Sequence, residues 1–413
     1  MEKIEIAVIG GGASGLLLTN ALADYNEIAG TPLPKTVVFE RGERVGKKLS
    51  STGNGQGNVT NRGVLTAEYF SSENTEAEKI SAILRAHDDK DFANFWAHRG
   101  VLLTQDERGR VYPAGRQASA LTDALRFSAA EKGIALRTST RVTDVQKRAD
   151  GFLLTCENGG QTYTCQAEKV VLCVGGKAAK NFGTDGTSYA LAQNLGHSVT
   201  PLYPSLVQLK TDTTYIKTLK GIRVNGGVLT AKTPLSEHTE HGDIIFTDYG
   251  VSGDAAFRVS AFIARELAAG KTTLSIDFLP EYTEAEVLSA MREKRTAYAA
   301  IDNSELLFGI VNNQIGRAVM RRAGNDLCKA AKLVKDFSLT VTGSLGFDYA
   351  QVTKGGIPLL ETDGNLQSNF VKGLYFAGEM LDVDGQCGGF NLQWAYSSAC
   401  MVAAALAKTS QKR

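Results

Sequence analysis

A glycine-rich turn has the residue spacing of a phosphate-binding loop. Gly10-x-Gly12-x-x-Gly15 directly follows the apolar run 4–9 and precedes a helical pattern. In such a loop the first glycine allows a tight turn, the second lets the backbone approach a pyrophosphate, and the third allows close helix-to-strand packing. The phosphates would lie at the helix N-terminus, where free N–H groups face them. The turn therefore predicts a dinucleotide site with five candidate contacts: Gly10, Gly12, Ala13, Ser14 and Gly15.

An acidic residue at the end of the next strand supports the same interpretation. The β-branched and aromatic run 36–39 leads into Glu40, whose carboxylate can accept hydrogen bonds from both ribose hydroxyls. A carboxylate at this position argues against a bound 2′-phosphate. Arg41 follows, and Gly46 then opens a long loop, a layout similar to the extension of FAD-binding glutathione-reductase-like domains. We therefore predict FAD as the dinucleotide.

Only one such glycine motif occurs in the chain. A second Gly-x-Gly-x-x-Gly is absent downstream, which excludes a dedicated NAD(P)H domain and the disulfide-reductase architecture. NAD(P)H is therefore expected only as a transient electron donor. The parallel-strand pattern returns at 373–378, as expected for a segment that comes back to close the cofactor site.

The elements that position these residues follow from hydrophobic patterning. Strand, glycine turn, helix and strand form a β–α–β unit over residues 4–40, and 46–63 is a loop without periodicity. Further strands are expected at 135–142, 151–156, 161–165 and 169–174, a strand-rich stretch at 197–278, helices over 283–335, and a last helix at 391–408. The simplest topology is a discontinuous nucleotide-binding domain whose two segments flank an inserted β part and an inserted helical part.

Composition limits the classes of protein that fit. The 413 residues are 43% hydrophobic and 22% charged, which excludes disorder. The longest nearly apolar stretch, 395–406, is too short and polar to span a bilayer, and the opening residues lack a signal-peptide pattern. Six cysteines without a CxxC pair fit reduced thiols. We therefore expect a cytoplasmic protein without membrane anchor, disulfide or metal site.

Charge is balanced overall but uneven along the chain. The formal net charge is +1, so a nucleic acid would need a local basic patch. Between Arg292 and Lys335, nine basic residues stand against four acidic ones. Lys329, Lys332 and Lys335 are spaced three apart, so some of these side chains share a helix face. A solvated helix surface and an RNA-binding surface both fit this pattern.

Two long blocks of sequence identify a resemblance. The blocks are GKKLSSTGNGQGNVTN at 46–61, and GEMLDVDG with GGFNLQWA at 378–385 and 388–395. The segments GRVYP at 109–113, GTDGTSY at 183–189 and FTDYGVSG at 246–253 support them. Over essentially its whole length the chain resembles the BaiN/RdsA-like family of FAD-dependent oxidoreductases.

The resemblance implies a fold and a cofactor site. The fold class would be α/β, with a discontinuous FAD-binding Rossmann-like domain of the glutathione-reductase type, an inserted β-barrel-like domain and an inserted helical domain. The segments would be 1–196 (FAD-binding), 197–280 (β-rich), 281–337 (helical) and 338–413 (return through the β-rich insert to about 357, then FAD-binding). Besides the glycine turn, the candidate cofactor contacts are Glu40, Arg41, Lys48, Thr52, Gly53, Asn58, Val142, Gly175, Gly378, Glu379, Asp382, Gly388, Gly389, Asn391 and Leu392.

Within that implied site, Glu379 and Asp382 would lie near the ribityl chain. Gly388 and Gly389 would place the N-terminus of the last helix at the flavin pyrimidine, where partial positive charge stabilises an anionic reduced ring.

Candidate catalytic residues are Cys387, beside the expected flavin ring, and Asp248. Each has a plainer interpretation, Cys387 as a packed thiol and Asp248 as a turn former. The chain also departs from the family pattern: many members carry Arg-Cys where this chain has Gln56 and Gly57, and many carry His in place of Asp248. A thiol or imidazole role is therefore not transferred to those positions.

The expected reaction is hydride transfer between flavin N5 and a substrate carbon. The leading hypothesis is reduction of a uracil ring of ribosomal RNA to dihydrouridine, motivated by the basic helical segment. A small-molecule enone reductase or amine oxidase is the alternative. A non-catalytic FAD-bound scaffold or RNA-binding protein is a third hypothesis.

Overall fold

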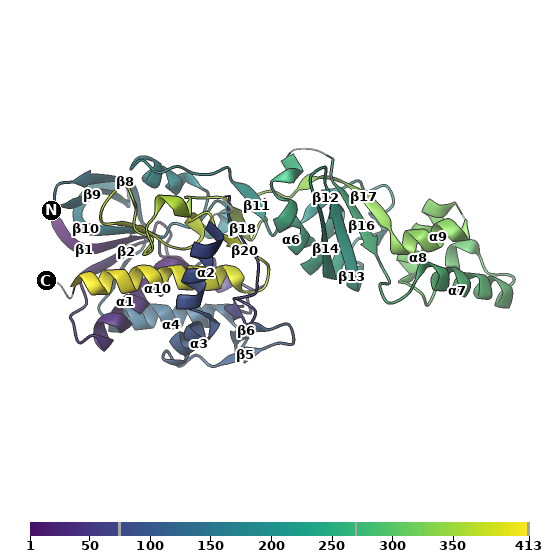
Figure 1. Cartoon of the computed structure of the whole chain (residues 1–413), viewed down its shortest axis with the longest axis horizontal. Coiled ribbons are helices and arrows are strands. Elements are labelled where there is room, and N and C mark those ends of the chain that lie inside the picture. Colours follow the sequence, from purple (N-terminus) through teal and green to yellow (C-terminus); the bar gives the residue numbers. More distant parts are fainter. Residues whose placement is uncertain (73–75, 269–270, 325, 411–413) are drawn as a thin grey trace. The chain divides into compact units, whose positions relative to one another are not determined.

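The computed structural model describes residues 1–72, 76–268, 271–324 and 326–410, which include every candidate site residue. Residue 325, inside the segment predicted as helical, lies outside them. The chain divides into a first unit, Met1–Tyr203 with Val352–Arg413, and a second unit, Pro204–Gln351 (Figure 1). It crosses between the units at β11 (Tyr203–Ser205) and just before β18 (Val352–Lys354). The predicted boundary between a β-rich and a helical insert stays a prediction.

A mostly parallel sheet forms the centre of the first unit. Its parallel part contains β7 (Ala135–Arg137), β2 (Thr36–Phe39), β1 (Glu2–Ile9), β10 (Gln161–Leu172) and β19 (Leu374–Phe376). These strands are apolar along most of their length because both faces of a parallel sheet are buried. The sheet continues beyond β10 through two antiparallel strands, β9 (Gly151–Asn158) and β8 (Thr140–Arg148).

One strand differs from the sequence-based expectation. The pattern predicts separate strands at 161–165 and 169–174, but β10 is continuous from Gln161 to Leu172. Its first half pairs with β9 and its second half with β1. The polar residues Glu168 and Lys169 therefore mark where one strand passes from a hairpin with an exposed face into the buried sheet.

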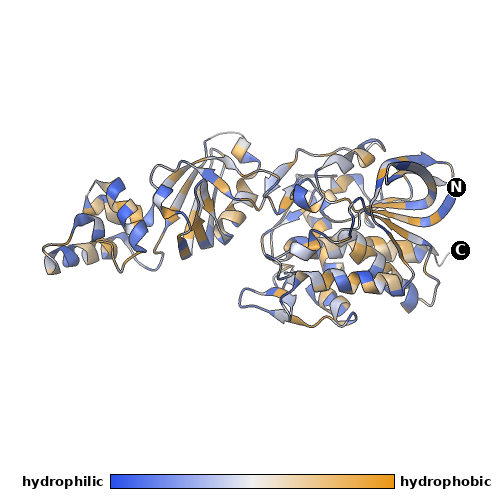
Figure 2. Cartoon of the chain, turned by 180° about the vertical axis from the view of Figure 1, so that it is seen from behind, coloured by the Kyte–Doolittle hydropathy of each residue, from blue (hydrophilic) through white to orange (hydrophobic). Residues whose placement is uncertain are grey.

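Helices cover the central sheet. The first and last helices, α1 (Ala13–Ile28) and α10 (Phe390–Ser410), lie side by side (Figure 1). Around them pack α2 (Ala77–Ala86), α3 (Asp89–Ala97) and α4 (Ala118–Glu131), while α5 (Ala190–Gln193) is a short helix before the first crossing. Apolar residues follow the central strands and α10 (Figure 2), and they form one hydrophobic core. Among the described residues, none of the helices is both long and apolar enough to cross a membrane.

Two small sheets connect the long loop to the C-terminal block. The strand β3 (Thr60–Asn61) pairs with β6 (Arg110–Pro113), which pairs with β5 (Leu103–Gln105). The strand β4 (Tyr69–Phe70) pairs with β20 (Asp384–Gly385). Because these strands join residues more than 300 positions apart, they bring the two blocks that carry the family resemblance into one region.

A closed barrel and a group of helices form the second unit. The barrel order is β12 (Leu209–Thr211), β15 (Gly250–Ser252), β14 (Glu237–Phe246), β13 (Arg223–Lys232), β16 (Thr273–Asp277) and β17 (Phe337–Ser344). The helices α7 (Glu284–Ala297), α8 (Asn313–Ala323) and α9 (Leu327–Lys335) share one hydrophobic core with the barrel. The strand-rich stretch also contains a helix, α6 (Asp254–Ile263), that packs on β14. Its apolar face is what the alternating pattern of the neighbouring strands obscures.

Candidate functional site

The glycine turn joins β1 to α1 and leaves open space at one position. Gly10 has φ +108°, and a Cβ there would lie 2.3 Å from the carbonyl oxygen of Cys173. Gly12, the N-cap of α1, has an ordinary φ of −79°, and a Cβ there would meet nothing within 4 Å. The protein therefore requires glycine at Gly10 for its own packing, whereas the space at Gly12 is available to a ligand. Ala13, Ser14 and Gly15 form the first turn of α1.

Glu40 lies beside this turn at the end of β2. Its Oε2 accepts the Gly11 N–H at 2.9 Å and its Oε1 accepts the Gly42 N–H at 2.7 Å. A carboxylate has about four lone-pair positions, so each oxygen keeps capacity for another donor. The geometry fits a carboxylate that is held rigidly by the backbone while it accepts ribose hydroxyls.

Arg41 points to a second loop of the first unit. Its guanidinium pairs with Asp185 at 3.0 Å and donates to the Gly183 carbonyl. Burial acts to raise the pKa of Asp185, but hydrogen bonds from Thr187 and Arg41 outweigh it and lower that pKa to about 2. Gly175 packs against Thr184 of the same loop. Val142 is buried on β8, and its predicted contact with the cofactor stays a prediction.

The long loop packs against the C-terminal block. Lys48 pairs with Glu379 at 2.8 Å. Thr52 and Gly53 lie in a tight turn closed by the Thr52 hydroxyl on the Leu49 carbonyl at 2.8 Å. With its amide oriented to donate to the Thr60 carbonyl, Asn58 accepts the Gly389 N–H at 3.2 Å. Two segments that are remote in sequence therefore form one surface.

The C-terminal block itself is fixed by backbone contacts. The Gly378 N–H donates to the Ser398 hydroxyl at 2.9 Å. Gly389 has φ +99°, and a Cβ there would lie 2.5 Å from the Thr60 carbonyl oxygen, so only glycine allows this approach. Asn391 accepts the Gly385 N–H at 2.9 Å and donates to the Gly385 carbonyl at 2.8 Å. These bonds define the turn that leads into α10, whose first turn includes half-buried Leu392.

Asp382 supplies a test of whether the site fits a polyhydroxylated group. Its side chain is fully buried. Its Oδ2 accepts the Ser72 N–H at 3.0 Å and the Thr200 hydroxyl at 3.1 Å. Its Oδ1 has no hydrogen-bond partner among the described residues. A buried acceptor without a donor is costly, and a ribityl hydroxyl is a donor of the required kind, so the residues present fit FAD.

Residues that sequence reasoning missed complete this site. Glu379 accepts the Thr353 N–H at 3.0 Å, and the Thr353 hydroxyl accepts the Lys177 N–H at 2.7 Å. Lys354 and Asp384 form a buried ion pair at 3.0 Å. These residues and Thr200 lie in connecting segments, and the two glycines after Lys354 were the one sequence signal that could have drawn attention to β18.

The two candidate catalytic residues lie in different units. Cys387 is half-buried in the turn before α10, next to Gly388. Asp248 belongs to the second unit, in the exposed turn between β14 and β15, and pairs with Lys220 at 2.7 Å. The hydrogen bond from Lys220 lowers the pKa of Asp248, which keeps it ionised at neutral pH. Asp248 is thus poorly suited to donate a proton, and its role stays a prediction. Among the described residues, no group of three or more His, Cys, Asp or Glu side chains could hold a metal ion.

The fold and site define an FAD-dependent oxidoreductase with a Rossmann-like domain. The chain belongs to the family described as the HI0933-like protein Rossmann domain, whose model matches residues 4–405. The predicted family resemblance, fold class and enzyme class are thereby confirmed.

Curated relatives match along almost the whole chain. The chain is 32% identical to a 3-dehydro-bile acid delta(4,6)-reductase of Clostridium scindens, over 98% of this chain and 99% of that protein. It is 25% identical to a ribosomal RNA dihydrouridine synthase of Haemophilus influenzae, over 98% of both, and 26% identical to one of Escherichia coli, over 97% of both.

Solved structures show the same fold at low identity. A 3-ketosteroid-delta4-(5alpha)-dehydrogenase from Rhodococcus jostii aligns with a TM-score of 0.51 and 15% identity, over 98% of this chain and 97% of that one. The flavoprotein subunit FrdA of Escherichia coli quinol fumarate reductase aligns with a TM-score of 0.53 and 15% identity, over all of this chain and 71% of that one.

Proposed function

We propose that this flavoenzyme reduces a carbon–carbon double bond that is conjugated to a carbonyl group. The names of its curated relatives support the proposal, because a delta(4,6)-reductase of a 3-dehydro-bile acid and a dihydrouridine synthase both saturate such a bond. Bound reduced FAD supplies a hydride from N5 to the β-carbon of the substrate. The protein must then orient that carbon and provide a proton for the α-carbon.

The residues that would hold the cofactor come from the glycine turn, Glu40, the long loop and the C-terminal block. The open space at Gly12 would take the pyrophosphate, Glu40 the ribose, and the free Oδ1 of Asp382 a ribityl hydroxyl. The N-terminus of α10 begins at Phe390, directly after Gly388 and Gly389. Its free N–H groups and dipole would stabilise negative charge on the reduced ring.

Cys387 is the proton donor that we propose within the first unit. Its half-buried thiol lies in the turn before α10, so it can pass a proton to the α-carbon and regain one from solvent. Cys387→Ala should slow product formation while flavin reduction by NAD(P)H continues. Equal rates of reoxidation by substrate in Cys387→Ala and the wild type would remove this role.

The substrate that we propose is a uracil ring in ribosomal RNA, and the observation that carries it is a basic face on α7 and α9. We define the basic face as Arg292, Arg295, Lys329 and Lys332, all exposed. Arg292 lies 4.0 Å from the Cys328 sulfur, which places the exposed sides of α7 and α9 next to each other. In the described part of the chain these four side chains form no ion pair.

The other basic residues of the helical segment are used within the protein. Lys335 pairs with Asp277 at 2.8 Å and Arg317 with Glu305 at 2.7 Å. Arg322 donates to the Ser338 carbonyl at 2.7 Å. The surface available to phosphates is therefore smaller than the sequence count indicates, but it lies on one side of two adjacent helices. Such a face suits phosphate contacts, whose strength falls with salt.

Anaerobic single-turnover measurements test the substrate. The NAD(P)H-reduced enzyme is mixed with an unmodified ribosomal RNA transcript, and flavin absorbance and dihydrouridine content are followed. The proposal predicts reoxidation coupled to dihydrouridine formation, with an apparent affinity that falls steeply between low and high salt. Reoxidation without dihydrouridine would exclude the RNA substrate.

A small enone is the second candidate, favoured by the 32% identity to the bile acid reductase. Reoxidation by a steroid-like dienone, but not by RNA, would select it. Reoxidation by neither, with hydrogen peroxide formed from amines, would indicate an amine oxidase. A bound flavin that no pyridine nucleotide or amine reduces would indicate a non-catalytic FAD-bound protein. We place the reaction in the cytoplasm, where the six free cysteines would remain reduced.

A further inference from the structure

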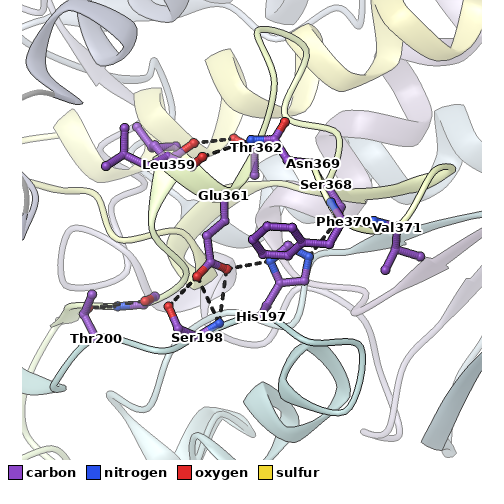
Figure 3. A network of polar contacts seen from close by, with 12 residues as sticks. His197, Ser198, Thr200, Leu359, Glu361, Thr362, Ser368, Asn369, Phe370 and Val371 are labelled. Atoms are coloured by element: carbon purple, nitrogen blue, oxygen red, sulfur yellow. Dashed lines mark hydrogen bonds and ion pairs between the residues drawn. The ribbon is translucent and has the colours of Figure 1, made fainter.

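A buried polar network lies on segments of the first unit that the cofactor site does not include. The His197 Nδ1 is 2.7 Å from the Glu361 Oε2, and its Nε2 is 2.7 Å from the Ser368 hydroxyl (Figure 3). The His197 side chain has no exposed surface. Its ring packs against Phe370 and Phe376, with centroid distances of 4.9 Å and 4.7 Å. The network is therefore rigid and dry.

The order serine, histidine, glutamate resembles a hydrolytic triad, but the surroundings exclude that chemistry. The Ser368 hydroxyl accepts the Phe370 N–H at 3.0 Å and the Val371 N–H at 2.8 Å. With its proton donated to His197, both of its lone pairs are occupied. A buried oxygen without a free lone pair cannot attack a substrate. The network acts as a brace between residues 197–198 and 361–371.

The brace continues toward the cofactor site along the chain. Ser198 donates its N–H and its hydroxyl to Glu361 Oε1, at 3.2 Å and 2.5 Å. Two residues later, the Thr200 N–H donates to the Gly356 carbonyl and the Thr200 hydroxyl accepts the Gly356 N–H, both at 2.9 Å. The same hydroxyl donates to Asp382 Oδ2 at 3.1 Å. Thr200 thus links the braced segment to the buried carboxylate.

We propose that His197 is a positioning residue for the cofactor site, which acts through Thr200 on Asp382. The brace fixes the backbone of 197–200, and this backbone sets the hydroxyl that occupies Oδ2 of Asp382. Oδ1 is then left as the one oxygen that faces an incoming donor. The inference rests on the proposed contact between Asp382 and the cofactor.

Retention of FAD by the holoprotein tests this, followed as flavin fluorescence released on dilution and as visible circular dichroism of the bound flavin. His197→Leu removes the brace and Thr200→Val removes the hydroxyl. Each should weaken retention by about tenfold, as expected for the loss of one hydrogen bond to a charged group. The double variant should be no weaker than the weaker single one, because both changes break the same chain of contacts. Both single variants should alter the flavin circular dichroism in the same way.

Matched variants separate positioning from general damage. His87 is another mostly buried histidine, paired with Asp91 at 3.0 Å and packed near Tyr396, but its side chain has no hydrogen bond toward Asp382. His87→Leu should lower the unfolding temperature without a change in FAD retention. His197→Asn keeps a donor for Glu361 and should restore part of the retention, and it replaces His197→Leu if that variant does not fold.

The outcomes are distinguishable. Wild-type retention in the His197 variants, or losses that multiply in the double variant, would overturn the inference while the cofactor contact stands. Unchanged retention in Asp382→Asn would remove that contact and the inference with it.

Discussion

Single residues at the phosphate turn show how glycine can be required for two different reasons. At Gly10 the backbone needs a left-handed conformation and the carbonyl of Cys173 fills the space of a side chain. At Gly12 the backbone is ordinary and the space is empty. The first requirement belongs to the fold and the second to the ligand, although the sequence motif presents them alike.

Gly12→Ala should therefore change FAD binding and not folding. We expect the free energy of unfolding of the FAD-free protein to change by less than about 1 kcal/mol, with FAD affinity lowered by at least about tenfold. Gly10→Ala, the matched control, should cost at least about 2 kcal/mol in the FAD-free protein because of its strained φ. Urea unfolding and FAD titration measure both. Equal destabilisation by the two substitutions would contradict this distinction.

Burial of His197 predicts a dependence of stability on pH. Burial lowers the pKa of His197 below its ordinary value of 6.5, although Glu361 acts in the opposite direction. Above that value the imidazole is neutral in both states. As the pH falls below it, the unfolded chain binds a proton before the folded one, so stability is lost by up to about 1.4 kcal/mol per pH unit.

The difference between wild type and His197→Asn isolates this contribution. Urea unfolding between about pH 7.5 and about pH 5.5 should show a smaller acid-induced loss in the variant. A loss of the same size in both proteins would show that other groups carry the pH dependence.

At the scale of elements, the helical segment is where sequence and structure weigh charge differently. The sequence shows nine basic residues between Arg292 and Lys335, but ion pairs and carbonyl contacts use several of them within the second unit. What remains is the basic face on α7 and α9. Because unpaired exposed cations are the ones that displace counterions from a polyanion, this face is where RNA affinity should concentrate.

Charge reversal on α9 tests the basic face. Lys329→Glu with Lys332→Glu should lower RNA affinity at least about tenfold and reduce its salt dependence, with FAD content unchanged. Lys90→Glu, an exposed lysine on α3 that is flanked by Asp89 and Asp91, is the control and should leave RNA affinity unchanged. Binding curves by filter retention at several salt concentrations provide the measurement. Equal effects of both changes would assign RNA binding to overall charge.

At the scale of the whole molecule, the chain forms two units with separate hydrophobic cores. Every candidate cofactor contact lies in the first unit, while the basic face and Asp248 lie in the second. Cofactor binding should therefore act on one core and leave the other unchanged, since a ligand stabilises only the cooperative unit that binds it.

Calorimetry of the FAD-free and FAD-saturated protein tests this division. We expect two unfolding transitions, of which FAD at about 100 times its Kd raises one by roughly 5–10 °C. The other transition should stay in place. A single transition, or an equal shift of both, would show that the two units unfold together.

The sequence by itself determined the features that depend on neighbours along the chain. The run 4–9, the glycine turn, the helix after it and Glu40 follow from local periodicity and backbone conformation, and the structure shows β1, α1 and β2 in that order. The family resemblance was also visible in two contiguous blocks. These signals are local because strands, helices and turns are set largely by residues within a few positions of one another.

Tertiary structure alone decided which distant residues meet. The free oxygen of Asp382, its contact with Thr200, and the brace from His197 to Ser368 join segments more than 150 residues apart. No periodicity in either segment encodes such a pair, because a hydrogen bond between two loops depends on where the sheet and helices bring them. The same reason made β10 look like two strands, since its pattern records a change of neighbours and not an end of the strand.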